Sequence, residues 1–318
     1  MSAGMRKISY WLAIALGALS YGAGQAVAAG GAGFTLSPAM QQIKIRSDQP
    51  RVSYALSITN DSQTDQNFVL SAVDFGALDE SGGVAFLGAP ASELEHRYGL
   101  ASWMILEKNT VFVPTKKSVK VTVTIENRQS LPPGGHYGAV LATAVNDPGT
   151  PAGDRVGVKQ VVSSLILVTK DGGAQADMKL VSQSGEGSWW NLPGVVTQRF
   201  QNTGNVHVVP RGVIELKDPM GRVVKRAAIN DGSTVILPES FRQYKSTLQS
   251  LKAAVLPGKY TLVSTYRYDG ITTTATLTSS FWYAGQLIVW TVAAGALIAA
   301  ILLGLWLWKR PHRNKRTK

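Results

Sequence analysis

The chain has 318 residues, no cysteine and a formal net charge of +12, from 32 Lys and Arg against 20 Asp and Glu. Eight basic residues lie at the two ends, so the remainder carries 24 basic and 20 acidic side chains, a net charge of +4. This balance does not support a nucleic-acid-binding protein. Without cysteine there is no disulfide, so each folded domain depends on a hydrophobic core.

The N-terminus has the pattern of a secretory signal peptide. Arg6 and Lys7 precede an apolar run over residues 8–19, and Ala26-Val27-Ala28 matches a cleavage site of the A-x-A kind. We predict a signal peptide over residues 1–28 and a flexible mature N-terminus over 29–33. An uncleaved N-terminal anchor is the alternative. Both interpretations place the following residues outside the cytoplasm.

Residues 34–172 predict a first β-sandwich. Val121 and Val123 lie in an alternating segment, apolar at every second residue, which is the period of a half-buried strand. Gly, Pro and Asn turns separate the predicted strands, as in an antiparallel immunoglobulin-like sandwich. The strands are expected at residues 52–59, 68–75, 119–126, 136–145 and 156–169.

An insertion over residues 76–104 interrupts this domain. Ser92 and Glu95 form a capping-box pattern that predicts a short helix over residues 93–98. Such a segment is either a binding loop on a rigid scaffold or a solvated decoration that covers a sheet edge.

Residues 175–283 repeat the plan of the first domain. The turn at residues 201–205 matches that at 58–61, and Leu256-Pro257-Gly258-Lys259-Tyr260 matches residues 131–137. Proline sets φ for such a turn, glycine supplies φ > 0, and the tyrosine buries its ring while its hydroxyl bonds to nearby backbone. We therefore predict an all-β protein of two tandem immunoglobulin-like antiparallel β-sandwiches.

Residues 287–308 are 22 residues without a charge, long enough to cross a bilayer as a helix of roughly 33 Å. Leu287 and Trp290 lie at one end, and Trp306 and Trp308 at the other, where interfacial aromatic residues are common. A basic tail over residues 309–318 follows. It predicts a single-pass protein of the cell membrane, with the C-terminus in the cytoplasm and the two sandwiches outside the cell. Its charges are Lys309, Arg310, Arg313, Lys315, Arg316 and Lys318.

Catalytic patterns are missing from the sequence. The four histidines have no metal-ligand spacing, and there is no Gly-x-Ser-x-Gly turn. We expect no enzyme activity, no cofactor and no metal. Trp103 is predicted to pack in the first core. The candidate recognition residues are Trp189 and Trp190, which are expected either to stack on sugar rings or fill a partner's pocket, or to plug the joint between the domains.

The order of these segments resembles the bacterial WxL-interacting proteins. The residues that carry the resemblance are 34–38 (FTLSP), Ser102-Trp103-Met104, 111–114 (VFVP), and the PPGGHYGAVL segment that begins at Pro132. The resemblance implies a peptidoglycan-binding-type first sandwich that attaches to cell-wall glycan, and a second sandwich that binds a surface protein.

We therefore predict a membrane-anchored surface protein that binds cell-wall glycan, another surface protein or both. One alternative is an envelope assembly factor resembling a pilus chaperone, which lends a strand to subunits. Another is the extracellular sensing partner of a signalling complex. A second protein would have to carry the signal, because a ten-residue tail is too short for a cytoplasmic domain.

Overall fold

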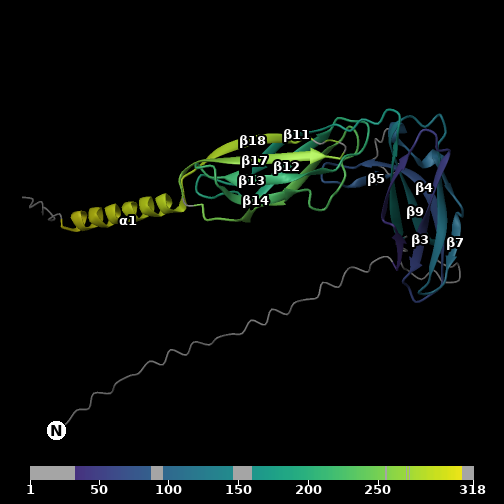
Figure 1. The fold of residues 1–318 in the computed structure, drawn as a ribbon. Helices are drawn as coiled ribbons and strands as arrows, with labels where there is room; N and C mark the ends of the chain where they lie inside the picture. Colours follow the sequence, from purple (N-terminus) through teal and green to yellow (C-terminus); the bar gives the residue numbers. More distant parts are fainter. Residues whose placement is uncertain are drawn as a thin grey trace, which may run out of the picture.

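The computed structural model describes residues 33–86, 96–145 and 160–309, apart from positions 255, 270 and 272. These residues are mostly β-strand, with one apolar helix at the C-terminal end (Figure 1). The first sandwich lies across one end of the second, and the helix leaves from the opposite end of the second (Figure 1). The predicted signal peptide and the tail residues from Arg310 onward lie outside the described residues.

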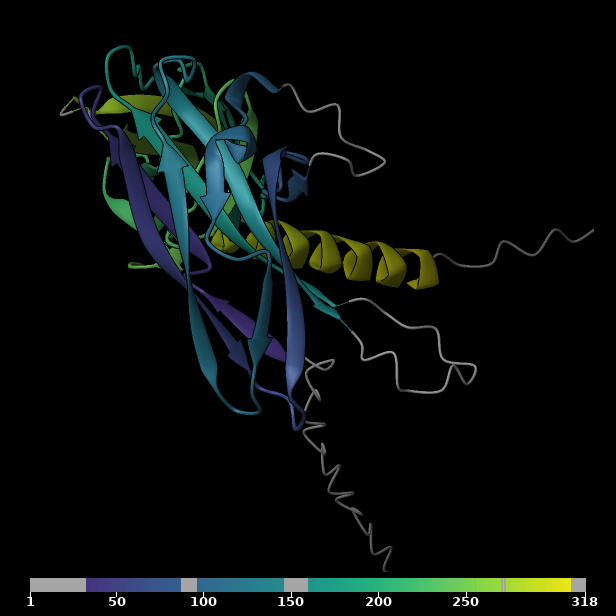
Figure 2. The same cartoon turned by 90° about the vertical axis from the view of Figure 1, so that its right-hand side faces the viewer.

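The first sandwich packs two sheets face to face, and Figure 2 shows it in front of the second sandwich. One sheet has the strand order β1 (Phe34–Ser37), β3 (Arg51–Asn60), β8 (Ser118–Glu126), β6 (Met104–Leu106). The other has the order β2 (Met40–Ile45), β10 (Val161–Lys170), β9 (Gly134–Val145), β4 (Gln66–Ala77), β5 (Val84–Phe86), with β7 (Thr110–Val113) paired to β4.

The predicted alternation accounts for the core of this sandwich. Leu56 on β3 and Val121 on β8 are fully buried and lie opposite each other in the ladder. Trp103 does not pack in this core as predicted. It is only half-buried, in a short 3₁₀-helix (Ala101–Trp103), and lies beside the ring of His136. The buried cluster takes Leu100 and Met104, on either side of it, instead.

One strand pair departs from the predicted antiparallel arrangement. β2 pairs with β10 in parallel, from Met40 opposite Leu165 to Ile45 opposite Lys170. The reason is that the chain leaves one sheet after β1 and crosses to the other at Pro38 and Ala39, so it arrives at the edge of the second sheet running in the direction of β10.

The second sandwich has a three-stranded and a five-stranded sheet. The first has the order β11 (Met178–Gly185), β12 (Val195–Asn202), β15 (Phe241–Thr247). The second has the order β16 (Gln249–Ser250), β14 (Val223–Ile229), β13 (Pro210–Lys217), β17 (Gly258–Tyr268), β18 (Ala275–Tyr283). Val196, Phe200 and Leu262 belong to its buried cluster, which is separate from that of the first sandwich.

Two asparagines show that the second sandwich repeats the first. The amide of Asn60 donates to the carbonyls of Thr64 (2.8 Å) and Val113 (3.0 Å). The amide of Asn202 donates to the carbonyls of Val206 (2.7 Å) and Ile236 (3.0 Å), again to one carbonyl four residues on and to another much further along the chain. Each asparagine is buried at the end of its strand, so the same polar device closes the same turn in both copies.

The Pro-Gly turns also recur, but their aromatic residues match differently from the prediction. Gly134 has φ 125° and Gly258 has φ 140°, the conformation for which glycine is suited. Tyr260 donates from its hydroxyl to the carbonyl four residues earlier (2.8 Å), and His136 contacts the carbonyl four residues earlier through Nε2 (2.8 Å). His136 is thus the counterpart of Tyr260. Tyr137 is one residue further along and faces the opposite side of its sheet.

Helix α1 (Gln286–Lys309) covers the predicted span. Over Trp290–Lys309 its mean hydropathy is 2.1 and none of it is buried, so by length and composition this helix is apolar enough to cross a membrane. The side chains of Trp290, Trp306 and Trp308 are exposed on it, while that of Leu287 lies outside the described residues. The orientation of the chain in a membrane stays a prediction from its basic tail.

Candidate functional sites at the two ends of the second sandwich

The joint between the sandwiches uses the inserted segment. In the turn between β4 and β5, the carboxylate of Glu80 accepts two hydrogen bonds from Arg199 (2.8 and 2.5 Å) and one from Gln243 (2.8 Å). The backbone N–H of Gln243 also donates to the carbonyl of Glu80 (2.7 Å). The hydrogen bonds from Arg199, and then the one from Gln243, lower the pKa of Glu80 to about 2. The carboxylate is therefore ionised throughout the neutral range.

A second contact comes from the other end of the insertion. Arg97 and the hydroxyl of Tyr98 both donate to the carboxylate of Glu239, each at 2.8 Å. The insertion was predicted to be a binding loop or a decoration that covers a sheet edge. Its strand β5 does pair with β4 at the edge of the sheet, and its described parts also hold the two sandwiches together. Ser92 and Glu95, the predicted capping box, lie outside the described residues, and only a 3₁₀-turn (His96–Tyr98) follows them.

Between these polar contacts lies a small apolar seam. Phe75, Tyr137 and Leu167 of the first sandwich are buried together with Leu237 of the second. The Tyr137 hydroxyl lies 3.4 Å from Nδ1 of His207, and burial lowers the pKa of His207 to about 4. The imidazole is therefore neutral at neutral pH, which suits its apolar surroundings.

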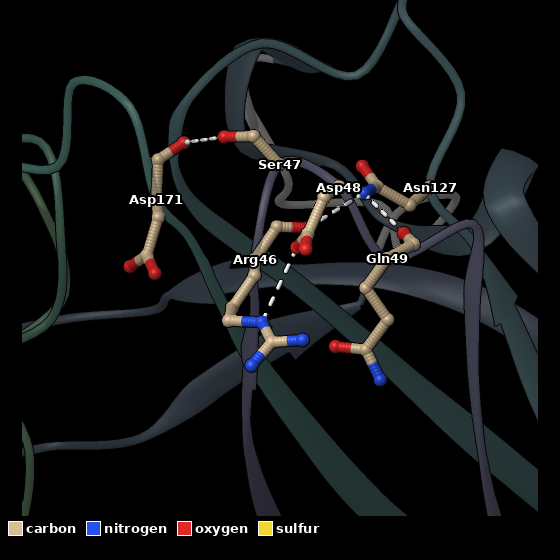
Figure 3. A network of polar contacts seen from close by, with 6 residues as sticks. All are labelled: Arg46, Ser47, Asp48, Gln49, Asn127 and Asp171. Carbon is tan, nitrogen blue, oxygen red and sulfur yellow. Dashed lines mark hydrogen bonds and ion pairs between the residues drawn. The ribbon is translucent and has the colours of Figure 1, made fainter.

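The connection between the domains is fixed on both sides, and Figure 3 shows the contacts with the first sandwich. The hydroxyl of Ser47 donates to the carbonyl of Asp171 (3.3 Å), and the amide of Asn127 ties down the turn that carries Ser47 by donating to the carbonyls of Arg46 and Gln49. From the second sandwich, the amide of Asn205 donates to the carbonyl of Gly173 (2.9 Å). The interdomain segment is thus bonded to both domains.

The unpaired edge of β10 is a feature that the sequence analysis missed. β2 pairs with β10 only from Leu165 onward, and within the described residues no strand pairs with the same side of Val161–Ser164. The Leu165 N–H donates to the carbonyl of Ala39 (2.9 Å), so the N–H of Ser163, two residues earlier, points out of the same edge. The sequence signal that could have indicated this unpaired segment is Pro38, where the chain crosses between the sheets before β2 begins.

Trp189 and Trp190 lie at the other end of the second sandwich, in the loop between β11 and β12. Their rings form an edge-to-face pair 4.9 Å apart, and the side chains are 58% and 51% exposed. The carbonyl of Trp189 accepts a hydrogen bond from the N–H of Ala284, two residues before α1 (2.7 Å). The pair therefore does not plug the joint between the domains, because the strands of the second sandwich separate it from that joint.

Nothing in the described ranges brings together three or more His, Cys, Asp or Glu side chains that could hold a metal ion. His136 is a buried structural residue whose two ring nitrogens each lie near a backbone carbonyl, and His207 belongs to the joint. The side chain of His96, and His312, lie outside the described residues.

No protein-family model and no curated protein matches the chain. Among solved structures, it is similar to a chain of the chaperone–tip adhesin complex of CFA/I fimbriae, with 12% identity, TM-score 0.42, and coverage of 80% of this chain and 100% of that one. The class 5 fimbriae chaperone CfaA gives 12% identity, TM-score 0.38, and coverage of 78% and 98%. A chain of the Salmonella enterica SafA pilin–SafB chaperone complex gives 8% identity, TM-score 0.38, and coverage of 77% and 96%. Similarity at this level carries no argument about function.

Proposed function

We propose that the chain is a non-enzymatic, membrane-anchored envelope protein whose first sandwich binds a segment of another exported protein as an added β-strand. The observation that carries this proposal is the edge of β10 at Val161–Ser164, with which no described strand pairs. An unpaired edge presents N–H and C=O groups to a partner chain, and recognition by strand addition uses such groups for affinity. This is the assembly-factor alternative from the sequence.

The surroundings of this edge favour an extended peptide. Val161 is 51% exposed at its start, and the hydroxyl of Ser164 is already bonded to the carbonyl of Pro38 (2.7 Å), where β2 begins its approach. A peptide strand that pairs with Val161–Ser164 therefore continues the line of β2 along the same edge. Side chains of the peptide alternate between the two faces of the sheet, which supplies specificity.

In this proposal α1 anchors the chain in the cell membrane, with both sandwiches outside and the C-terminus in the cytoplasm. The second sandwich separates the binding edge from the anchor (Figure 1). Attachment to cell-wall glycan, implied by the resemblance to WxL-interacting proteins, is the competing function. No contact among the described residues favours it.

The test compares two substitutions at one position. The full chain in detergent micelles is used to capture proteins from an envelope extract and, separately, to sediment with isolated cell wall. Ser163→Pro removes the outward N–H, whereas Ser163→Ala keeps it and removes only the hydroxyl. We expect protein capture by the wild type and by Ser163→Ala, and loss of capture by Ser163→Pro with an unchanged melting temperature.

Equal capture by both variants would show that β10 is not the binding edge. Sedimentation with cell wall, without protein capture, would favour glycan attachment instead.

A further inference from the structure

Exposed apolar side chains gather at the end of the second sandwich from which α1 leaves. Besides Trp189 and Trp190, Trp282 near the end of β18 and Met220 in the β13–β14 turn are each 71% exposed. The strand register places all of these segments at one end, because Gly258 at the start of β17 lies opposite Tyr283, while Lys217 lies opposite Thr261. Three aromatic side chains exposed together need an explanation that an isolated exposed residue does not.

These segments are tied to the root of the helix. The N–H of Ala284 donates to the carbonyl of Trp189, and only Ala284 and Gly285 separate β18 from α1. Pro219 of the β13–β14 turn packs on Gly258, which brings this turn to the same end. The loop that contains Trp189 is hydrogen-bonded to the residues before α1, so this loop and the beginning of α1 occupy one small region.

The same region is hollowed and mainly apolar. A shallow concavity of about 410 Å³ is lined by Trp189, Pro257, Gly258, Trp282, Tyr283 and Ala284. Trp282 also lies directly across the ladder from Lys259, which is exposed. A tryptophan beside a lysine is the combination found at the boundary between the hydrocarbon and the headgroups of a bilayer.

The charges of these segments suit a headgroup layer with anionic lipids. Lys252 and Lys259 are exposed, and Lys225 donates from Nζ to the carbonyl of Pro193 (2.9 Å). Of the two acids, Asp218 is buried and paired with Arg222 (2.7 Å), which leaves Glu186 as the exposed one. Basic residues close to a membrane anchor add attraction to an anionic leaflet.

We propose that Trp189, Trp190 and Trp282 insert into the outer interface of the same bilayer that α1 crosses, and so hold the second sandwich against the membrane surface. The occupant is the bilayer because the aromatic cluster is continuous with the root of α1, two residues from its first turn. This inference rests on the proposed anchoring by α1. It assigns the tryptophan pair to lipid, in place of the sugar or protein pocket expected from the sequence.

The absence of cysteine from the chain allows a direct test, because a single introduced cysteine is a unique labelling site. Three full-length variants, Met220→Cys, Leu297→Cys and Ile105→Cys, are labelled with an environment-sensitive fluorophore and reconstituted in phosphatidylcholine–phosphatidylglycerol vesicles. Position 220 reports on the proposed contact, position 297 on α1, and position 105, exposed on β6 of the first sandwich, is the control. Quenching by lipids with a nitroxide in the headgroup or in the acyl chain is then measured.

We expect headgroup quenching at position 220, acyl-chain quenching at position 297, and neither at position 105. Replacing the three tryptophans (Trp189→Ala, Trp190→Ala, Trp282→Ala) is expected to abolish the quenching at position 220 and leave that at position 297 unchanged. The matched control, Val69→Ala with Phe112→Ala, removes exposed apolar side chains from the first sandwich and is expected to change neither. Circular dichroism of each variant reports on folding.

Quenching at position 297 without quenching at position 220 in the otherwise wild-type chain would overturn the inference while leaving α1 as an anchor. This result needs no tryptophan variant, so a folding defect in the triple substitution does not affect it. Unquenched label at position 297 would overturn the anchor and the inference with it. Loss of captured envelope protein in the triple variant, with position 220 unquenched in the wild type, would assign the surface to a protein partner.

Discussion

The two Pro-Gly turns begin alike and lie at opposite ends of the second sandwich, one at the joint with the first sandwich and the other beside α1. In the first sandwich, His136 occupies the inward position after Gly134, and Tyr137 points out into the joint with the second sandwich. In the second sandwich, Tyr260 occupies that inward position, and the outward-facing neighbour is Lys259, beside Trp282 at the root of α1. An aromatic residue one position further along lies on the other face of a strand, so a shift of one residue changes a core residue into an interface residue.

The largest expected effect on stability is at Tyr260, the inward residue of the second turn. Tyr260→Ala removes a fully buried ring from the second core and is expected to destabilise that sandwich by about 3–5 kcal/mol. Tyr260→Phe loses only the hydrogen bond to Leu256 and is expected to cost about 1 kcal/mol. Chemical denaturation monitored by circular dichroism measures both. Equal losses for the two variants would mean that the hydroxyl, and not the ring, stabilises the turn.

The repeated asparagines test whether the two copies are energetically alike. Asn60→Ala and Asn202→Ala each leave two carbonyls without their donor, and each is expected to cost about 3 kcal/mol. Equilibrium unfolding of both variants gives the comparison, with the exposed residue Asn67, changed to Ala, as a control. A loss in only one copy would show that the two turns share geometry without sharing its energetic role.

The surroundings of the outward Tyr137 are tested through the pH dependence of stability, because its hydroxyl lies beside His207. Burial holds the pKa of His207 at about 4, below its ordinary value of 6.5, so the unfolded chain binds the additional proton first as the pH falls. This contribution to stability is complete above pH 6.5, decreases between pH 6.5 and about 4, and amounts to about 3 kcal/mol at most. Thermal unfolding across this range is expected to show the loss, and His207→Gln is expected to flatten it. An unchanged slope in His207→Gln would place the acid sensitivity elsewhere.

The smallest expected effect on unfolding comes from the polar clamp. Glu80→Gln keeps the side-chain shape but removes the charge that Arg199 and Gln243 contact, at a site that is partly open to solvent. We expect little change in melting temperature and a wider distribution of interdomain angles in small-angle X-ray scattering. Asp79→Asn, in the same turn but without a described contact to the second sandwich, is the matched control. Identical scattering of wild type and Glu80→Gln would assign the rigidity to the apolar seam alone.

Local sequence pattern predicted the long strands β3, β4, β8, β9 and β10 of the first sandwich, because alternation at positions such as Val121 and Val123 reflects burial on one face. It missed what depends on distant partners. Nothing near Glu80 indicates Arg199, 119 residues away, and nothing near Met40 indicates a parallel partner on β10. The tryptophan pair was recognised in the sequence as a loop pair, but its place beside α1 follows from the strand order of the second sandwich, which no short segment specifies.

In the proposed arrangement, the length of the second sandwich sets the distance between the membrane and the first sandwich. Its strand β17 has 11 residues, and at about 3.3 Å per residue it extends up to roughly 36 Å. The joint is fixed by hydrogen bonds, and only two residues separate β18 from α1. We therefore expect a short, rigid connection between α1 and the first sandwich and not a flexible linker. Under the proposed anchoring, the edge of β10 stays within a thin layer parallel to the bilayer, and we expect it to bind only a partner whose own binding segment lies in that layer.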